Sequence, residues 1–178
     1  QAVNVLQPAI SSHGFNDPKK VYFVIYGGSN RDVCASSQLP SYATEGVIAN
    51  TAALYYPGKR SGSCIENNGG FKPEFNETAK AALHEILHVL GAVPQCAEDH
   101  LVFKNEGTIN DGIGGHISIP GDIMYSVQSN VTYDKAKHLD YKSTNYYNHK
   151  NPNCLDIAKS KYVTPTVIDS QLPSFGKR

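Results

Sequence analysis

The sequence lacks the features that mark several common protein classes. Its formal net charge is zero, with 16 basic and 16 acidic residues and no basic stripe. Nucleic acid is therefore not an expected partner, because phosphate binding needs clustered Lys and Arg. No apolar run approaches the roughly 18 residues needed to cross a bilayer, so we expect no membrane partner either. The 178 residues, 40% of them hydrophobic, are enough for a single domain with its own core.

Cysteine is scarce, and no two cysteines form a CxxC pair, so a four-thiolate zinc site is not expected. An even number in a chain of this size favours two disulfides, and the four cysteines are Cys34, Cys64, Cys96 and Cys154. Of the three connectivities we favour Cys34–Cys64 with Cys96–Cys154, which ties each half of the chain internally; four buried free thiols are the alternative. Disulfides imply an oxidising compartment. Because the chain begins at Gln1 without a signal-like stretch, we expect the mature form of a secreted protein.

Three segments carry clear patterns of regular structure. Val21–Tyr26 is a continuous β-branched and aromatic run that predicts a buried central strand, and Thr51–Tyr56 predicts a second strand. Apolar residues at helical spacing predict a helix over about residues 76–90, ended by Gly91. Beyond Gly91 the signals fade, although the Tyr- and Lys-rich residues 133–148 could carry a second helix.

The segment His84-Glu85-Ile86-Leu87-His88 carries the strongest chemical signal. Two histidines four residues apart on a helix project from one face, so both imidazoles can reach one metal ion at about 2.0–2.1 Å. Glu85 lies beside the first ligand and could take a proton from a water molecule activated by that ion. The alternative interpretation is a helix with two histidines whose hydrogen bonds are otherwise satisfied. A buried, apolar helix makes that alternative less favourable, because each imidazole would need a partner.

The residues that follow carry a resemblance to a known family. His84-Glu85-x-x-His88-x-x-Gly91 resembles the first part of the metzincin signature, in which Gly lets the chain turn beneath the metal. That family places its third ligand, usually His, three residues after the Gly, where this chain has Pro94. Asp122-Ile123-Met124-Tyr125 is similar to the metzincin Met-turn, whose Met forms an apolar floor under the metal site. Met124 is the only methionine of the chain.

The spacing before Met124 suggests where the third ligand lies. In matrix-metalloproteinase-like metzincins the third His precedes the turn Met by eight residues, and His116 precedes Met124 by the same interval. About twenty additional residues would then separate Gly91 from His116. This insertion, and residues 153–158, resemble a secreted bacterial metzincin-like group with the motif HExxHxLGAVPxCAPH…GHV…DxMY. The resemblance covers roughly residues 76–160.

Other side chains remain candidates for the third ligand or for a second ion. His100 is the rival of His116, and it also matches a His in the motif of the bacterial group. Gluzincins use a Glu on a second helix, but no helical pattern surrounds Glu98 or Glu106. Glu106, Asn110 and Asp111 could offer oxygen ligands to Ca²⁺, but their spacing is not that of an EF-hand, so a solvated turn is favoured.

The resemblance implies a single catalytic domain with an α+β, metzincin-like fold and zinc endopeptidase activity. A twisted mixed sheet and the active-site helix would form an upper lobe over about residues 1–91. A largely irregular lower lobe over about residues 92–178 would hold the Met-turn. One Zn²⁺ would be bound by His84, His88 and His116, with Glu85 as general base and then general acid.

The expected substrate is a protein or peptide that pairs with an edge strand of the upper lobe, with Thr51–Tyr56 as the candidate strand, and the expected state is a monomer. The rival hypothesis from another class is a secreted binding or adhesion domain with a structural zinc ion and no proteolysis. A closed site, with His100 as a fourth ligand, would support that rival, because it would exclude water from the metal.

Overall fold

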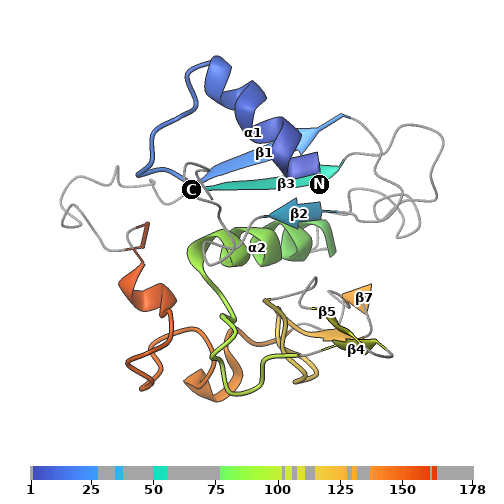
Figure 1. Cartoon of the computed structure of the whole chain (residues 1–178), viewed down its shortest axis with the longest axis vertical. Helices are drawn as coiled ribbons and strands as arrows, with labels where there is room; N and C mark the ends of the chain where they lie inside the picture. The colour runs from blue at the N-terminus through green and yellow to red at the C-terminus, as the bar shows by residue number, and fades with distance from the viewer. Residues whose placement is uncertain are drawn as a thin grey trace, which may run out of the picture.

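A computed structural model describes residues 2–27, 35–37, 50–55, 77–101, 103–105, 108–110, 115–127, 130–131, 137–160 and 162–163. These residues form a small α+β protein (Figure 1). Its elements in chain order are α1 (Ala2–Ser12), β1 (Tyr22–Tyr26), β2 (Ala35–Ser37), β3 (Thr51–Tyr55), α2 (Glu77–Leu90), β4 (Phe103–Asn105), β5 (Thr108–Asn110), β6 (Ser126–Val127), β7 (Asn130–Val131) and the 3₁₀ helices η4 (Tyr141–Ser143) and η5 (Ile157–Lys159). None of the described helices has the length and apolarity to cross a membrane.

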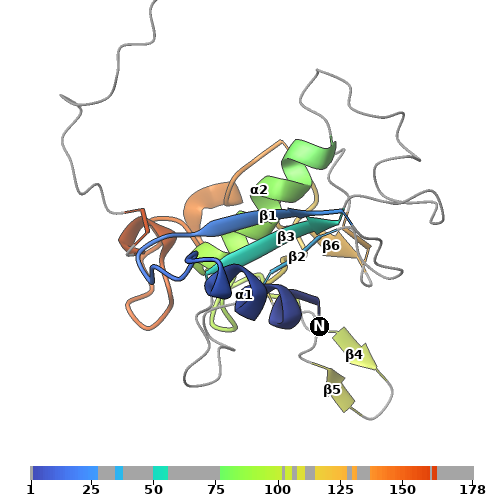
Figure 2. The ribbon, with the colours of Figure 1, turned by 90° about the horizontal axis from the view of Figure 1, so that it is seen from above.

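The first three strands form a mixed sheet in the order β1-β3-β2 (Figure 2). β3 pairs in parallel with β1 and antiparallel with β2, and all five of its residues are buried. The prediction that Thr51–Tyr56 is an edge strand is therefore wrong. β1, expected at the centre, lies at one edge of these three strands, and its end is solvent-exposed at Ile25. Both runs are continuously apolar, so their patterns could not tell which one is covered on both sides.

The two long helices cover opposite faces of this sheet (Figure 1). On one face Leu6 of α1 packs against Ala53 and Tyr55 of β3. On the other face Ala81 of α2 packs against Leu54. This alternation along β3 follows from the two-residue period of a strand, which sends successive side chains to opposite faces. The sequence patterns did not predict α1, in which Pro8 removes one backbone donor from the helix interior.

The helix α2 agrees with the helix expected over residues 76–90, and it ends where Gly91 predicts. Gly91 adopts a left-handed φ of 99°, a conformation that costs glycine little. Its N–H donates to His88 O at 2.9 Å, and the N–H of Ala92 donates to Leu87 O at 2.9 Å. These two bonds form a Schellman motif, which satisfies carbonyls at the helix end and turns the chain away from the sheet.

Beyond α2 the described residues are largely irregular, and their strands form two short antiparallel pairs, β4-β5 and β6-β7. An apolar core nevertheless joins this part to the helix, and it consists of Leu87, Ala92, Val93, Ala97, Ile117, Ile123, Met124, Tyr146 and Ile157. The predicted disulfide Cys96–Cys154 is confirmed and links the segment after α2 to the segment before η5. The other predicted pair, Cys34–Cys64, lies outside the described residues.

The second helix that could have covered residues 133–148 does not form within the described residues 137–148, which contain only the short η4. The backbone of Asp140, Lys142 and Ser143 adopts positive φ values of 47°, 69° and 52°. An α-helix cannot contain such residues, because its residues all have negative φ. The Asp140 carboxylate instead accepts hydrogen bonds from three backbone N–H groups, those of Asn145, Tyr146 and Tyr147.

Candidate metal centre

Three histidines from two distant segments meet beneath α2. His84 and His88 are four residues apart on the helix, and His116 belongs to the segment before the Met-turn-like residues. Their side chains are buried, with relative exposures of 1%, 6% and 8%. His84 Nε2 lies 3.0 Å from His88 Nε2 and 3.1 Å from His116 Nε2. Three imidazole nitrogens therefore converge on one point, which is a geometry that could hold a metal ion.

The hydrogen bond of His84 to the backbone decides which of its nitrogens faces this point. Its Nδ1 lies 2.7 Å from the carbonyl oxygen of Ile123. Because a carbonyl oxygen can only accept, the proton of His84 sits on Nδ1 and Nε2 presents a lone pair to the cluster. Ligating histidines commonly donate their other N–H to a carbonyl or carboxylate in this way, which orients the ring.

Burial keeps the imidazoles of His84 and His88 neutral. It lowers the pKa of His84 to about 3, with a further lowering from nearby His116 and a partial offset from the Ile123 carbonyl. It also places the pKa of His88 well below its ordinary value, helped by the proximity of His84 and His116. Neutral imidazole is the form that binds metal, so neither His84 nor His88 would need to lose a proton to bind an ion at neutral pH.

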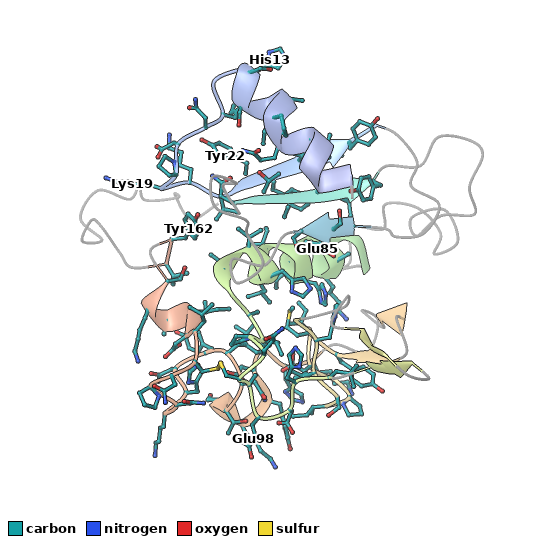
Figure 3. The ribbon with its side chains drawn as sticks, viewed as in Figure 1. His13, Lys19, Tyr22, Glu85, Glu98 and Tyr162 are labelled. Carbon is teal, nitrogen blue, oxygen red and sulfur yellow. A yellow bond between two sulfur atoms is a disulfide. The ribbon has the colours of Figure 1, made fainter. Side chains whose placement is uncertain are left out.

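Glu85 is a buried carboxylate of α2, and it contacts the sheet at β2. Figure 3 shows it between α2 and β2. Its Oε2 accepts a hydrogen bond of 2.7 Å from the Ser37 hydroxyl on β2. Burial raises the pKa of Glu85 to about 7, and the Ser37 hydrogen bond opposes that rise. No local signal could have identified Ser37, because it lies 48 residues from Glu85 in the chain.

The residues that resemble a Met-turn do form a tight turn. The N–H of Tyr125 donates to Asp122 O at 3.1 Å, and the N–H of Met124 donates to Asp122 Oδ1 at 2.8 Å. Met124 is fully buried in the core below α2. The turn contacts both ligand segments, because Ile123 O accepts from His84 while Met124 O accepts from the N–H of Ile117, next to His116.

The rival ligands lie elsewhere. Among the residues that the structure describes, the single group of three or more possible metal ligands is His84, His88 and His116. His100 is partly buried and pairs with Ile117 through an isolated β-bridge, outside that group. Glu98 is solvent-exposed. Of the residues considered for Ca²⁺, Asn110 ends β5, whereas Glu106 and Asp111 are outside the described residues.

A buried polar network supports the turn of residues 122–124, and no sequence pattern predicted it. Asp122 Oδ1 accepts a second hydrogen bond from the Tyr146 hydroxyl at 2.8 Å, and Oδ2 accepts from the N–H of Tyr141 at 2.9 Å. The Tyr146 hydroxyl in turn accepts from the N–H of Asp140 at 2.6 Å. Asp122, Asp140 and Tyr146 are all buried. Their hydrogen bonds span up to 24 residues of sequence, so no short pattern reveals them.

Comparison with known proteins yields no relative. The chain matches no protein-family model, no curated protein and no solved structure. The resemblance to metzincins therefore depends on the motif residues themselves. The structure supports a coarser statement, that a small α+β protein buries three histidines that could bind a metal ion such as zinc.

Proposed function

We propose that the protein is a zinc-dependent endopeptidase with a metzincin-like organisation. In this proposal His84, His88 and His116 bind one Zn²⁺, and Glu85 is the general base. The observation that carries the proposal is the convergence of the three buried Nε2 atoms, 3.0–3.1 Å apart for two of the pairs, on the helix that also bears Glu85.

The donor set fits a zinc ion. Four ligands at about 2.0–2.1 Å in a tetrahedron lie about 3.3–3.4 Å from one another, which is close to the separations between the histidine nitrogens. Three protein ligands and an open position are typical of catalytic zinc, whereas structural zinc has four protein ligands. Within the described residues no fourth His, Cys, Asp or Glu joins the group. This favours the peptidase over the adhesion domain with a closed site.

A bound zinc ion supplies Lewis-acid chemistry, because it lowers the pKa of water and polarises a peptide carbonyl. The contribution of the chain itself is made by Glu85. Because Ser37 donates to Oε2, we expect Oε1 to take the proton from the attacking water. The same carboxyl group would later donate that proton to the leaving amine. Burial raises the pKa of Glu85 to about 7. A pKa near neutrality suits a group that must first accept a proton and then donate it.

The substrate in this proposal is an extended peptide. In the described sheet β2 is the edge strand nearest α2, and Ser37 at its end contacts Glu85. An edge strand offers unpaired backbone groups that an extended peptide can pair with. We therefore assign substrate pairing to β2 in place of the interior strand β3.

The test compares two glutamate variants at equal zinc content. Glu85→Gln removes the proton acceptor and keeps the size of the side chain, so kcat on casein or a quenched-fluorescence peptide should fall by about 10²- to 10⁴-fold, the range that general acid–base catalysis contributes. Glu98→Gln is the matched control, because Glu98 is exposed and lies at the far end of the C-terminal part (Figure 3). It should leave both kcat and zinc content unchanged.

Metal analysis by mass spectrometry accompanies the assay. Equal cleavage by the wild-type protein and by zinc-loaded Glu85→Gln would contradict the catalytic role. Absence of cleavage from a wild-type protein that holds one zinc per chain would favour the adhesion domain. A wild-type protein that binds no zinc would overturn both hypotheses.

A further inference from the structure

We propose that Tyr146 is a positioning residue of the metal centre, which holds His84 and His116 in place through Asp122 and the turn of residues 122–124. The proposal rests on the metal site proposed above. Tyr146 touches no histidine of the site in the described contacts, so its effect must pass through the backbone of the turn.

The first step of the argument is that one short turn orients two ligands. The carbonyl of Ile123 accepts the Nδ1–H of His84 at 2.7 Å, and the carbonyl of Met124 accepts the N–H of Ile117 at 3.0 Å. These two carbonyls belong to neighbouring residues. Any rotation of the turn would therefore move the ring of His84 and the backbone beside His116 together, and their nitrogens would no longer converge.

The second step is that Asp122 holds the turn by its side chain. Its carboxylate accepts three hydrogen bonds, from the N–H of Met124, the N–H of Tyr141 and the hydroxyl of Tyr146. The bond to Met124 sets the conformation of the turn. The other two bonds anchor the carboxylate to a separate segment, so the turn cannot rotate while these bonds persist. A carboxylate with only 1% exposure needs such partners, because burying an unpaired charge is costly.

The third step is that Tyr146 is itself fixed at every polar atom. Its hydroxyl donates to Asp122 and accepts from the N–H of Asp140. Its backbone N–H donates to the Asp140 carboxylate, and its carbonyl accepts from the N–H of Ile157 at 2.8 Å. The ring is fully buried in the core that includes Met124. The hydroxyl is therefore a rigid link between the Asp140 segment and the turn.

The experiment measures zinc affinity in two Tyr→Phe variants. Tyr146→Phe keeps the ring in the core and removes the hydroxyl that connects Asp140 to Asp122. We expect the zinc Kd to rise roughly 10- to 100-fold, as when a partner that orients a ligand is lost. Competition with a chromophoric chelator measures this Kd. Cobalt substituted for zinc should show weaker visible absorption, because the tetrahedral geometry is disturbed.

Tyr22→Phe is the matched control. The Tyr22 hydroxyl also accepts a backbone N–H, that of Asp17 at 2.9 Å, but it lies on the sheet away from the metal centre (Figure 3). We expect Tyr22→Phe to lower the unfolding midpoint while the zinc Kd stays within twofold of wild type. A Tyr146→Phe protein with the zinc Kd and cobalt spectrum of wild type would overturn the positioning role.

A second measurement uses the wild-type protein, so it can refute the positioning role even if Tyr146→Phe does not fold. Coupling is reciprocal: if the network tightens zinc binding, zinc must stabilise the network by the same factor. Residue-resolved hydrogen exchange should therefore slow roughly 10- to 100-fold on zinc addition at the N–H groups of Met124, Asp140 and Tyr141. The N–H of Asp17 should not change. Unchanged exchange at the three network N–H groups would refute the proposal.

The possible results distinguish failure of the positioning role from failure of the metal site on which it rests. A wild-type protein that fails to bind zinc in the competition assay removes the metal site and the positioning role together. A wild-type protein that binds zinc, with Tyr146→Phe equally tight and network exchange insensitive to zinc, removes only the positioning role.

Discussion

His100 and His116 are neighbours in space, although sixteen residues separate them in the chain. The segment of His100 pairs with Ile117 through a β-bridge, and the N–H of Leu101 donates to His116 O at 2.8 Å. The spacing to Met124 favoured His116 in the sequence, and His100 was its rival. The Nε2 atom of His116 lies 3.1 Å from that of His84, and the group of possible metal ligands in the described residues includes His116 and not His100. The assignment of His116 as the third ligand agrees with this geometry and remains a prediction.

At the residue scale, alanine variants distinguish the two histidines. His116→Ala removes one of three nitrogen donors, so its zinc Kd should rise by more than the roughly 10- to 100-fold that loss of an orienting partner costs. His100→Ala should keep its zinc Kd within a few-fold of wild type. Equilibrium dialysis with metal analysis gives both values. Loss of zinc from His100→Ala with retention by His116→Ala would contradict the assignment.

At the scale of elements, the end of α2 determines where the chain leaves the helix after His88. Gly91 has a positive φ of 99°, and a Cβ there would lie 3.7 Å from the nearest atom of Leu155, which is ordinary contact. The requirement for glycine is therefore conformational and not one of space. That is why its position could be predicted from sequence, since helix termination depends on neighbouring residues.

The prediction for this element is a stability change. Gly91→Ala should lower the free energy of unfolding by about 1–2 kcal/mol, because an L-residue is strained at this φ. Gly27→Ala is the control: Gly27 has no positive φ and open space at its Cβ, so stability should stay equal or rise by up to about 1 kcal/mol. Urea unfolding at fixed zinc concentration measures both. Equal effects of the two substitutions would show that the left-handed conformation of Gly91 does not contribute to stability.

The region of residues 137–148 shows the limit of prediction at this scale. Its Tyr and Lys content is compatible with a helix, yet Asp140 binds three backbone N–H groups and several residues adopt left-handed φ. The same arrangement anchors Tyr146 and, through it, Asp122. Side-chain capture of backbone donors competes with helix formation, and its outcome depends on partners elsewhere in the chain.

At the scale of the whole molecule, a metal ion would join α2 to the C-terminal part. His84 and His88 belong to the helix that packs on the sheet, whereas His116 belongs to the irregular part that follows. The same junction already contains the apolar core around Leu87 and Met124. A ligand that binds the folded chain and not the unfolded chain raises stability by mass action.

Removal of zinc should therefore lower the melting temperature. At free zinc a thousand times the Kd, binding contributes about 4 kcal/mol, which EDTA would abolish. For a chain of this size each kcal/mol changes Tm by about 2–4 °C. His116→Ala serves as the control, because its weaker zinc binding should make the Tm difference between zinc and EDTA clearly smaller than that of the wild-type protein. Identical Tm values for the zinc-loaded and EDTA-treated wild-type protein would contradict a metal ion at this junction.

Local spacing determined the helix that carries His84 and His88, its end at Gly91 and the tight turn at Met124, because each depends on residues a few positions apart. The sequence favoured the pairing of Cys96 with Cys154 among three connectivities, and the structure confirmed it. Tertiary structure decided which of the described strands is central and that the ring of His116 meets the helix. It also decided that Ser37 bonds to Glu85 and Tyr146 to Asp122. Those outcomes depend on contacts between residues far apart in the chain, and only the packed fold brings such residues together.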